Sequence, residues 1–551
     1  MDKSGYIKDC KREGTRNDTT VIDGKKTVGF QEMESKTWTS DKPPPLLGSS
    51  RLALSLIACV GFLNLYALRV NLSVAMVCMV NQTALDLIKD AENGGSGETN
   101  QRPATCNGVE KESSNDTTSG DREGEFVWSK EIQGYVLGSF FWGYLLTQVL
   151  GGWLAARYGG KRVYGYFMLM CAIVTLLMPV SARTDYKLLM VMRLIAGICQ
   201  GVVWPSMAVL WTKWAPSLES GKLTGICYAG SQIGNVVTFP IASLLCEYGF
   251  DGGWPSVFYV LGTFGLIWFI GWMIIVADSP EQHPRISNAE REYICENRKN
   301  NHAAEKEKPK TPTPWFAILT SRRVWAIIVT HTCANWGTYT FLTNIPSYMK
   351  EVLYFDLKKN GLLSALPYIG FGAAISISGM LFDLEVSRGL LNKTTARKLG
   401  NTLGLLVPGI FVVGLAFVDC TQSTLAVALL VIGVAMSGFQ YGAGFLTNPA
   451  ELAPHYAGII FGISNTFATL PGIFAPMMIG YITTDQTQEQ WQKVFFIAAA
   501  IYTFGALFFI IFGSAEIQPW DQTALEVEVK VSVENSSNEK NTLQKAEKNE
   551  N

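Results

Sequence analysis

The chain has 551 residues, of which 48% are hydrophobic and only 17% are charged. Soluble globular domains carry about 25% charged residues, so this chain is short of charge for its length. Its 45 Lys and Arg residues nearly balance its 46 Asp and Glu residues, and the net charge of -1 excludes the basic excess of a nucleic-acid-binding protein and the acidic excess of a disordered solubilising segment.

The charged residues are concentrated in four segments, which are residues 1–51, about 86–130, 278–323 and the tail after Glu516. The blocks between them are apolar and long enough to cross the hydrocarbon core of a bilayer, which needs about 20 residues. The first block is too long for the core of a secretory signal, so we expect it to be a membrane span. The expected spans are 52–80, 131–155, 162–182, 187–212, 223–246, 257–277, 324–349, 361–382, 399–418, 424–447, 457–481 and 494–514.

These spans divide six and six on either side of the charged middle segment. The division indicates an all-α membrane protein with twelve transmembrane helices in two six-helix halves. The predicted domains are a disordered N-terminal tail at 1–51, a first six-helix bundle at 52–277, a linker at 278–323, a second six-helix bundle at 324–514 and a disordered tail at 515–551.

Lys and Arg residues indicate the side of the membrane on which each connection lies. They collect in the connections after the even-numbered spans and in the middle segment, so the positive-inside rule places those segments and both termini in the cytoplasm. The first connection, 81–130, then lies on the outer side, where Asn81 and Asn115 stand in glycosylation acceptor sequences. We therefore expect a glycosylated outer loop.

Eleven cysteines are scattered along the chain, seven of them in the expected spans, and none has the paired spacing of a metal site. The sequence therefore predicts neither a disulfide framework nor a zinc site. One pairing stays open, because Cys106 and Cys420 both fall on the expected outer side.

Pairs of glycines four residues apart recur inside the expected spans. Such pairs let two helix backbones approach closely, so we interpret them as helix-packing positions. The pairs are Gly134 with Gly138, Gly197 with Gly201, Gly230 with Gly234, Gly438 with Gly442, and Gly458 with Gly462.

Two arginines, Arg69 and Arg193, stand inside expected spans. An ionisable side chain in the bilayer core costs roughly 2.5–3.5 kcal/mol on insertion scales, which makes these residues functional candidates. Few carboxylates stand in the same spans to neutralise them, and guanidinium groups bind carboxylate and phosphate in a bidentate manner. The two arginines therefore predict an anion-binding site, and the alternative for each is a structural contact with a backbone carbonyl or a buried carboxylate.

Three tyrosines are candidates for the same site. Tyr66 precedes Arg69 by three residues and so shares its helical face. Tyr228 in the fifth span and Tyr339 in the seventh are expected to line the same cavity, although membrane tyrosines also serve as packing or interface residues.

Two connections carry a related pattern of residues. The second-to-third connection reads GGWLAARYGGKR, and the eighth-to-ninth begins with GMLFDLE and ends with TTARK. The two resemble the loop signature of the major facilitator superfamily, with Asp383 in the acidic place and Ala156 replacing it in the first half. The residues to which this resemblance assigns a gating role are Gly152, Arg157, Gly379 and Asp383.

Five longer segments resemble the anion:cation symporter family of that superfamily. They read LNLYALRVNLSVAMV, GSFFWGYLLTQVLGGWLA, WTKWAP, YMKEV and YAGIIFGISNTFATLPG. The similarity runs from about Arg51 to Trp520. It implies the twelve-helix major facilitator fold, and it matches Arg69 and Arg193 to the anion-binding arginines of the family.

Departures from the family pattern bear on the coupling ion. Proton-coupled members carry glutamates after the arginine of the fourth helix, whereas this chain reads RLIAGICQG, with Gln200 at the second of these positions. A glutamine cannot exchange a proton near neutral pH, which favours coupling to sodium or to the membrane potential. The remaining titratable candidates are His331 and Glu451, and the latter stands in NPAELAP where the family has N-H-L-D-I-A-P.

These observations predict a secondary active transporter that moves anions by alternating access, with no enzymatic activity and no cofactor beyond its coupling ion. The favoured cargo is inorganic phosphate or a small organic anion, carried with sodium across the plasma membrane by a monomer. The transport alternative is a proton-coupled vesicular or lysosomal transporter of acidic sugars or acidic amino acids. The non-transport alternative is an anion-binding membrane sensor. No nucleotide-binding, zincin or nucleophile-elbow motif stands in a context that would suit an enzyme.

Overall fold

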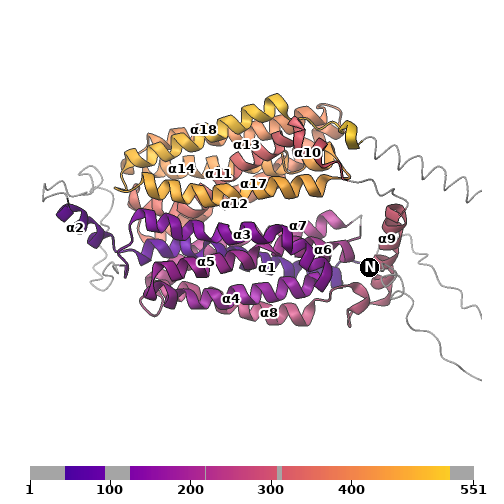
Figure 1. Cartoon of the computed structure of the whole chain (residues 1–551), viewed down its shortest axis with the longest axis horizontal. Coiled ribbons are helices and arrows are strands. Elements are labelled where there is room, and N and C mark those ends of the chain that lie inside the picture. Colours follow the sequence, from indigo (N-terminus) through magenta and orange to yellow (C-terminus); the bar gives the residue numbers. More distant parts are fainter. Residues whose placement is uncertain (1–43, 93–123, 217–218, 307–312, 522–551) are drawn as a thin grey trace, which may run out of the picture.

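The computed structural model describes residues 44–92, 124–216, 219–306 and 313–521. Within these ranges the regular structure is helical apart from one isolated β-bridge. The all-α architecture expected from the sequence is therefore confirmed. The helices form two bundles that lie side by side along their length (Figure 1).

Each bundle contains six long helical segments, and in each bundle the fourth segment is broken within its length. The segments of the first bundle are α1 (Ser50–Met79), α3 (Lys130–Tyr158), α4 (Gly160–Thr184), α5 (Tyr186–Gly201) continued by α6 (Val203–Trp214), α7 (Ser220–Tyr248) and α8 (Trp254–Ile275). Those of the second bundle are α11 (Arg322–Glu351), α12 (Leu357–Ser387), α13 (Lys393–Ala416), α14 (Ser423–Met436) continued by α15 (Gly438–Gly442), α17 (Ala457–Ile482) and α18 (Gln488–Phe512). The remaining helical elements are α2 (Gln82–Glu92), η4 (Pro280–Gln282), α9 (Asn288–Lys306), α10 (Trp315–Thr320), η5 (Cys420–Gln422) and α16 (Asn448–Leu452).

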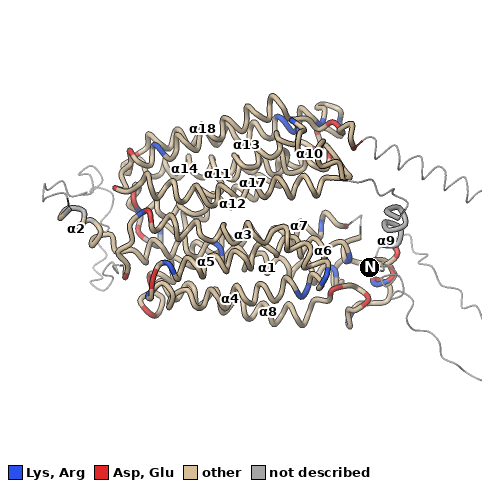
Figure 2. The backbone as a smooth tube through the Cα atoms, in the orientation of Figure 1, with Lys and Arg blue, Asp and Glu red and all other residues tan. Residues whose placement is uncertain are grey.

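The twelve expected spans coincide with these twelve segments, although length and hydropathy alone mark ten of them in the described part of the chain. The two segments that length and hydropathy alone do not mark as spans are α3 and α11. Both face the opposite bundle, since α3 packs on α17 and α11 packs on α1, and so they are shielded from lipid on that side. Acidic and basic residues gather at the two ends of the bundles and leave the middle nearly free of charge (Figure 2).

The two ends of the molecule are distinguished by the elements they carry. Helices α9 and α10 lie at one end, here called the linker end, and α2 lies at the opposite end, here called the loop end (Figure 1). Toward the loop end the bundles are in close contact, because a Cβ atom at Gly134 of α3 would lie 2.6 Å from the carbonyl oxygen of Pro476 on α17. Toward the linker end, Gly458 and Gly462 of α17 have no described atom within 4 Å of a Cβ position. Among the described residues the bundles are therefore packed together at the loop end, whereas this face of α17 has no close neighbour at the linker end.

Four of the five glycine pairs lie at helix contacts, as expected from their spacing. Gly197 of α5 shows why, because a Cβ atom there would overlap the carbonyl oxygen of Phe140 on α3. The fifth pair, Gly458 and Gly462, faces open space among the described residues, so the packing interpretation is wrong for this pair in the conformation seen here.

Replacing Gly197 by alanine is expected to lower the melting temperature of the purified protein. The added methyl group would force α5 away from α3, and overpacking of this kind costs typically about 1–3 kcal/mol. Thermal unfolding in detergent measures the change. Gly458→Ala is the matched control, because the same substitution there meets open space. Equal melting temperatures for the two variants would contradict the close contact of α5 with α3.

The folded part of the chain extends beyond the predicted bundle boundaries. Arg51, in the first turn of α1, is fully buried, with its Nε 2.7 Å from Glu219 Oε2. The backbone N–H of Arg51 donates to Glu290 Oε1 at 3.0 Å, so this carboxylate of α9 caps α1 and ties the linker helix to the first bundle. The tail boundaries predicted at residues 51 and 515 are wrong, because residues 44–51 and 515–521 belong to the folded chain.

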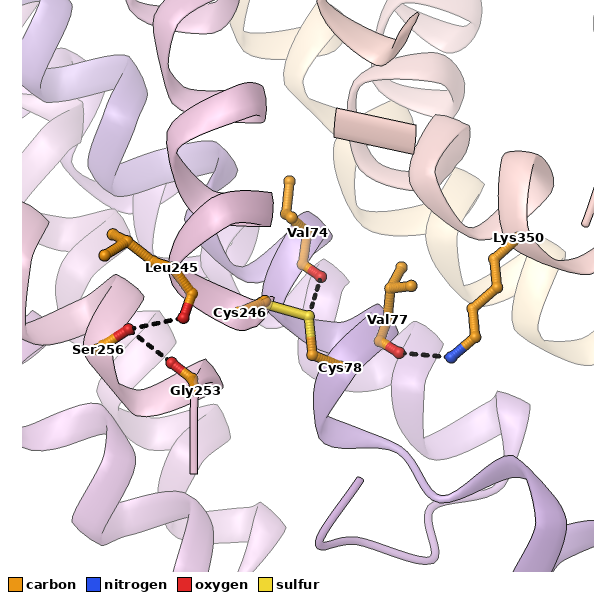
Figure 3. Close-up of a disulfide and its surroundings, with 8 residues drawn as sticks. All are labelled: Val74, Val77, Cys78, Leu245, Cys246, Gly253, Ser256 and Lys350. Carbon is orange, nitrogen blue, oxygen red and sulfur yellow. Dashed lines mark hydrogen bonds between the residues drawn. A yellow bond between two sulfur atoms is a disulfide. The ribbon is translucent and has the colours of Figure 1, made fainter. Parts of the chain in front are cut away.

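A disulfide joins Cys78, in the last turn of α1, to Cys246, in the last turn of α7 (Figure 3). This bond corrects the expectation of no disulfide framework. The two cysteines are 168 residues apart, and the packing of α1 against α7 brings their Cα atoms to 6.3 Å, within the usual range for a disulfide. Cys420 is also disulfide-bonded. Cys106 lies outside the described residues, so its pairing with Cys420 stays open.

Replacing Cys246 by serine is expected to lower the free energy of unfolding by about 2–4 kcal/mol, because the bond closes a long loop of the chain. The measurement is the melting temperature under non-reducing conditions. Cys59→Ser, which removes a free cysteine of α1, is the control. If Cys246→Ser and Cys59→Ser both have the melting temperature of the wild type, the disulfide contributes nothing to stability.

Candidate functional site

Arg69 lies in α1 with only 6% of its surface exposed. Its guanidinium carbon is 4.8 Å from the ring centres of both Tyr66 and Tyr144 and 5.2 Å from that of Phe140. Tyr66 belongs to the preceding turn of the same helix, and the other two rings come from α3. Three aromatic faces therefore hold the cation by cation–π attraction without neutralising its charge.

Arg193 lies beside this group on α5 and is 2% exposed. Its Nη2 donates to the backbone carbonyl of Arg69 at 3.4 Å, and its guanidinium carbon is 5.1 Å from the ring centre of Phe140. Gln200 is two turns further along α5 and accepts a hydrogen bond from Arg69 Nε at 3.2 Å. Residues seven apart share a helical face, which is why α5 presents both polar side chains to α1.

Several N–H donors of the two arginines remain available for a ligand. Arg69 Nη2, Arg193 Nε and Arg193 Nη1 are buried and have no hydrogen-bond partner among the described residues. Within the same part of the chain, neither guanidinium is paired with a carboxylate. Both line a small pocket, whose other lining residues are Val70, Ser73, Leu137, Phe141, Leu342 and Thr343. The arrangement is a buried positive site that suits an anion.

The other two predicted tyrosines have different surroundings. Tyr339 of α11 packs its ring at 4.5 Å, centre to centre, on Phe141, which lines the cavity. Tyr228 of α7 packs instead against Phe62 and Trp204, at 5.1 and 4.8 Å. The structure thus brings Tyr339 to the wall of the cavity and places Tyr228 in an aromatic cluster of the first bundle.

Sequence reasoning missed the contribution of α3 to this site. Phe140 and Tyr144 are four residues apart and therefore share the helical face that contacts Arg69. Aromatic residues at this spacing are common in apolar spans, so the sequence carries no signal that sets these two apart. Their role depends on which face of α3 is turned toward α1.

His331, a coupling candidate, is buried on α11. Its Nδ1 is 2.8 Å from Ser464 Oγ, and its ring stacks on that of Phe445 at 4.5 Å. Both contacts lie within the second bundle. The structure therefore gives His331 partners other than the two arginines.

Glu451, the other titratable coupling candidate, lies on α16 and accepts a hydrogen bond from Arg397 Nε at 2.9 Å. Arg397 Nη2 is also 3.4 Å from Asp383, at the end of α12. One arginine of α13 thus connects two acidic residues that the sequence assigned to different roles. A Cβ atom at Gly379, one turn before Asp383, would lie 3.4 Å from the carbonyl oxygen of Gly442, which is an ordinary contact.

The matching loop of the first bundle is built differently. Its acidic group comes from another segment, since Asp278, after α8, accepts a hydrogen bond from the backbone N–H of Lys161 at 2.8 Å and caps α4. The guanidinium carbon of Arg157 lies 6.0 Å from the ring centre of Trp153. A Cβ atom at Gly152 would lie 3.8 Å from a side chain of α6, an ordinary contact.

The predicted glycosylation residues lie on the chain segment between α1 and α3. Asn81 Oδ1 accepts a hydrogen bond from the backbone N–H of Ala84 at 2.8 Å, at the start of α2. Asn115 lies outside the described residues. Glycosylation of both asparagines stays a prediction.

Comparison with known proteins shows the family. The model of the Major Facilitator Superfamily matches residues 54–476. This chain belongs to that superfamily. An uncharacterized transporter of Caenorhabditis elegans is 42% identical to it over 484 residues, which cover 88% of this chain and 95% of the relative. Sialin of Homo sapiens is 40% identical over 476 residues, covering 86% and 92%, and vesicular glutamate transporter 2 of Homo sapiens is 36% identical over 472 residues, covering 85% and 75%.

These relatives confirm the anion:cation symporter group that the motifs resemble, and they show that this superfamily member is a multi-pass membrane transporter and not an enzyme. The inward-open structure of the xylose transporter XylE from E. coli supports the fold. It has a TM-score of 0.60 with 14% sequence identity, covering 84% of this chain and 96% of XylE. The major facilitator fold expected from the sequence is thereby confirmed.

Proposed function

We propose that this transporter carries a small organic anion, bound between Arg69 and Arg193, by alternating access of its two bundles. The observation that carries the proposal is the pair of buried guanidinium groups, which retain unpartnered N–H donors and have no carboxylate partner among the described residues. Charge is poorly screened in such a site, and guanidinium groups bind carboxylates through parallel hydrogen bonds. Vesicular glutamate transporter 2, by its name, carries an anion of this kind.

The lining of the cavity favours an organic anion over inorganic phosphate. Val70, Leu137, Phe141 and Leu342 give it apolar walls. The hydroxyl of Ser73 donates to the Val70 carbonyl of its own helix. A hydrated phosphate ion needs polar partners on every side, whereas a carboxylate with a short apolar body can use both the arginines and the apolar walls.

For the coupling ion we favour sodium, carried in symport. At the arginine site, Gln200 accepts a hydrogen bond from Arg69, and a glutamine cannot exchange a proton near neutral pH. The titratable candidates His331 and Glu451 are hydrogen-bonded to Ser464 and Arg397. A second candidate is proton-coupled transport in a vesicular or lysosomal membrane. The likeness to a vesicular glutamate transporter over 85% of this chain supports it.

The linker end, in this proposal, lies in the cytoplasm together with both termini. Positive residues collect in the connections at that end, and the Cys78–Cys246 disulfide at the loop end suits an oxidising compartment outside the cytosol. The protein then sits in the plasma membrane as a monomer, with Asn81 and Asn115 glycosylated. Deglycosylation shifts of Asn81→Gln and Asn115→Gln, and surface labelling of intact cells, test this placement.

Flux measurements test the substrate and the coupling ion together. The full-length protein is reconstituted in proteoliposomes and offered radiolabelled glutamate, sialic acid, urate or inorganic phosphate, under imposed sodium, proton or electrical gradients. We expect saturable uptake of an organic anion that requires sodium and is not inhibited by phosphate. Uptake that follows a proton gradient without sodium would favour the second candidate, and preferential uptake of phosphate would contradict the substrate class.

A further inference from the structure

A buried ion pair joins the two bundles at the loop end. Lys130 is the first residue of α3 in the first bundle, and Glu351 is the last residue of α11 in the second. Their side chains are 8% and 7% exposed and form a salt bridge. The other carboxylate oxygen of Glu351 accepts a hydrogen bond from Trp491 Nε1 at 3.1 Å. Among the described residues, the hydrogen bonds and ion pairs of these two side chains involve neither the two arginines of the candidate site nor Arg397.

Lys350, the neighbour of Glu351, also reaches across to the first bundle. Its Nζ donates to the carbonyl oxygen of Val77 at 2.7 Å, in the last turn of α1 (Figure 3). The cation lies at the C-terminal end of α1, where it matches the dipole of that helix. Two adjacent residues of α11 therefore hold two helices of the opposite bundle.

The helices that receive these contacts have little freedom to rearrange locally. Cys78, next to Val77, is bonded to Cys246, which holds the end of α1 to α7 (Figure 3). Helix α3 is packed closely on α5 of its own bundle, since a Cβ atom at Gly197 of α5 would overlap the carbonyl oxygen of Phe140 on α3. The ion pair is therefore broken most simply when the bundles separate as bodies at this end.

We propose that the Lys130–Glu351 pair is a lock that closes the loop end of the transporter and must break each time the anion site opens to that side. In the conformation seen here the bundles meet at the loop end, while Gly458 and Gly462, toward the linker end, have no neighbour within 4 Å of a Cβ position in the described part of the chain. Opening to the loop end separates the pair and exposes both charges to water. The pair thus exists in only one of the two states and sets the ratio between them. This inference rests on alternating access of the two bundles, and it does not depend on which anion or coupling ion is carried.

The burial of the Lys130–Glu351 pair determines which state a charge-removing substitution favours. If one partner is neutralised, the other charge stays buried and uncompensated in the loop-end-closed state, whereas water stabilises it in the open state. Removal of one charge therefore favours the open state. Exchange of the two charges restores a buried pair and returns the ratio toward that of the wild type, a result that loss of side-chain packing alone does not explain.

The experiment measures the distance between the bundles at the loop end. Spin labels introduced as unnatural amino acids at Lys187, on α5, and Glu489, on α18, are followed by pulsed electron paramagnetic resonance in nanodiscs. We expect Lys130→Ala and Glu351→Gln each to raise the ratio of open to closed populations by about tenfold or more, the ratio that corresponds to 1.4 kcal/mol. The exchange of charges, Lys130→Glu with Glu351→Lys, is expected to bring the ratio back toward the wild-type value.

A matched control comes from another ion pair at the same end of the molecule. Arg183 is paired with Asp251 at 2.9 Å, but both residues belong to the first bundle. Asp251→Asn should therefore leave the distribution of distances unchanged. The proposal is overturned if Glu351→Gln gives the wild-type distribution, or if Asp251→Asn opens the loop end to the same extent. The readout is a distance between two labels, so the test remains valid whether or not the anion and the coupling ion have been identified correctly.

Discussion

Replacing Arg69 by alanine is expected to raise the apparent KM for the transported anion by about 30-fold or more, because removing one partner of a buried charged contact costs about 2–5 kcal/mol. Arg69 is 6% exposed, and one of its terminal N–H groups has no partner among the described residues. The measurement is the concentration dependence of uptake into proteoliposomes that contain equal amounts of protein.

Two further variants separate the charge of Arg69 from its shape and from general effects on the protein. Arg69→Lys keeps the positive charge but loses the planar pair of donors, so we expect it to recover only part of the affinity. Arg183→Ala, which removes an arginine at the loop end away from the cavity, should leave the KM unchanged. Wild-type uptake by Arg69→Ala would remove Arg69 from the anion site.

Replacing Gln200 by glutamate is expected to weaken anion binding tenfold or more at neutral pH, which corresponds to about 1.4 kcal/mol. Gln200 is fully buried, and its carbonyl oxygen accepts a hydrogen bond from Arg69 Nε at 3.2 Å. A carboxylate in its place would neutralise Arg69 and compete with the transported anion. Protonation of the new carboxyl group would restore a neutral side chain, so the affinity should rise again as the pH falls.

Comparison of the wild type with Gln200→Glu and Gln200→Ala isolates the effect of the added charge on anion binding. Gln200→Ala removes the same hydrogen-bond acceptor without adding a charge, so we expect it to change the KM far less than Gln200→Glu and to add no pH dependence. The readout is the KM for the anion between pH 5 and pH 8 in wild type and both variants. If Gln200→Glu follows the wild-type pH profile with unchanged affinity, the side chain at position 200 does not control the charge of the site.

Local properties of the sequence sufficed to predict the helical segments and to single out the two arginines that the structure brings together. The transfer of a segment into the bilayer depends on its own composition, so the apolar blocks predicted the twelve helical segments to within about six residues at each end. An arginine in such a block is exceptional on its own, and Arg69 and Arg193 could be singled out without knowledge of their neighbours. The family followed from motifs that are continuous in the sequence.

The boundaries and several partners depended on residues that are distant in the chain. Arg51 was assigned to a tail, yet contacts with Glu219 and Glu290 make it part of the folded core. Glu451 was a coupling candidate, yet it shares Arg397 with Asp383. Both side chains are charged, and charged residues are usually exposed. Whether such a residue is buried depends on the partner that it meets in the folded chain, which the sequence does not show.

The sequence by itself therefore determined which segments enter the membrane, how they divide into two halves and which buried charges need an explanation, because these are free energies of transfer of single segments. Only the tertiary structure decided which charges meet. The rotation of α3 brings aromatic rings to Arg69, the packing of α1 on α7 forms the Cys78–Cys246 bond, and the contact of the bundles places Lys130 beside Glu351. These pairings depend on how helices are turned and packed against one another, and no local pattern encodes that arrangement.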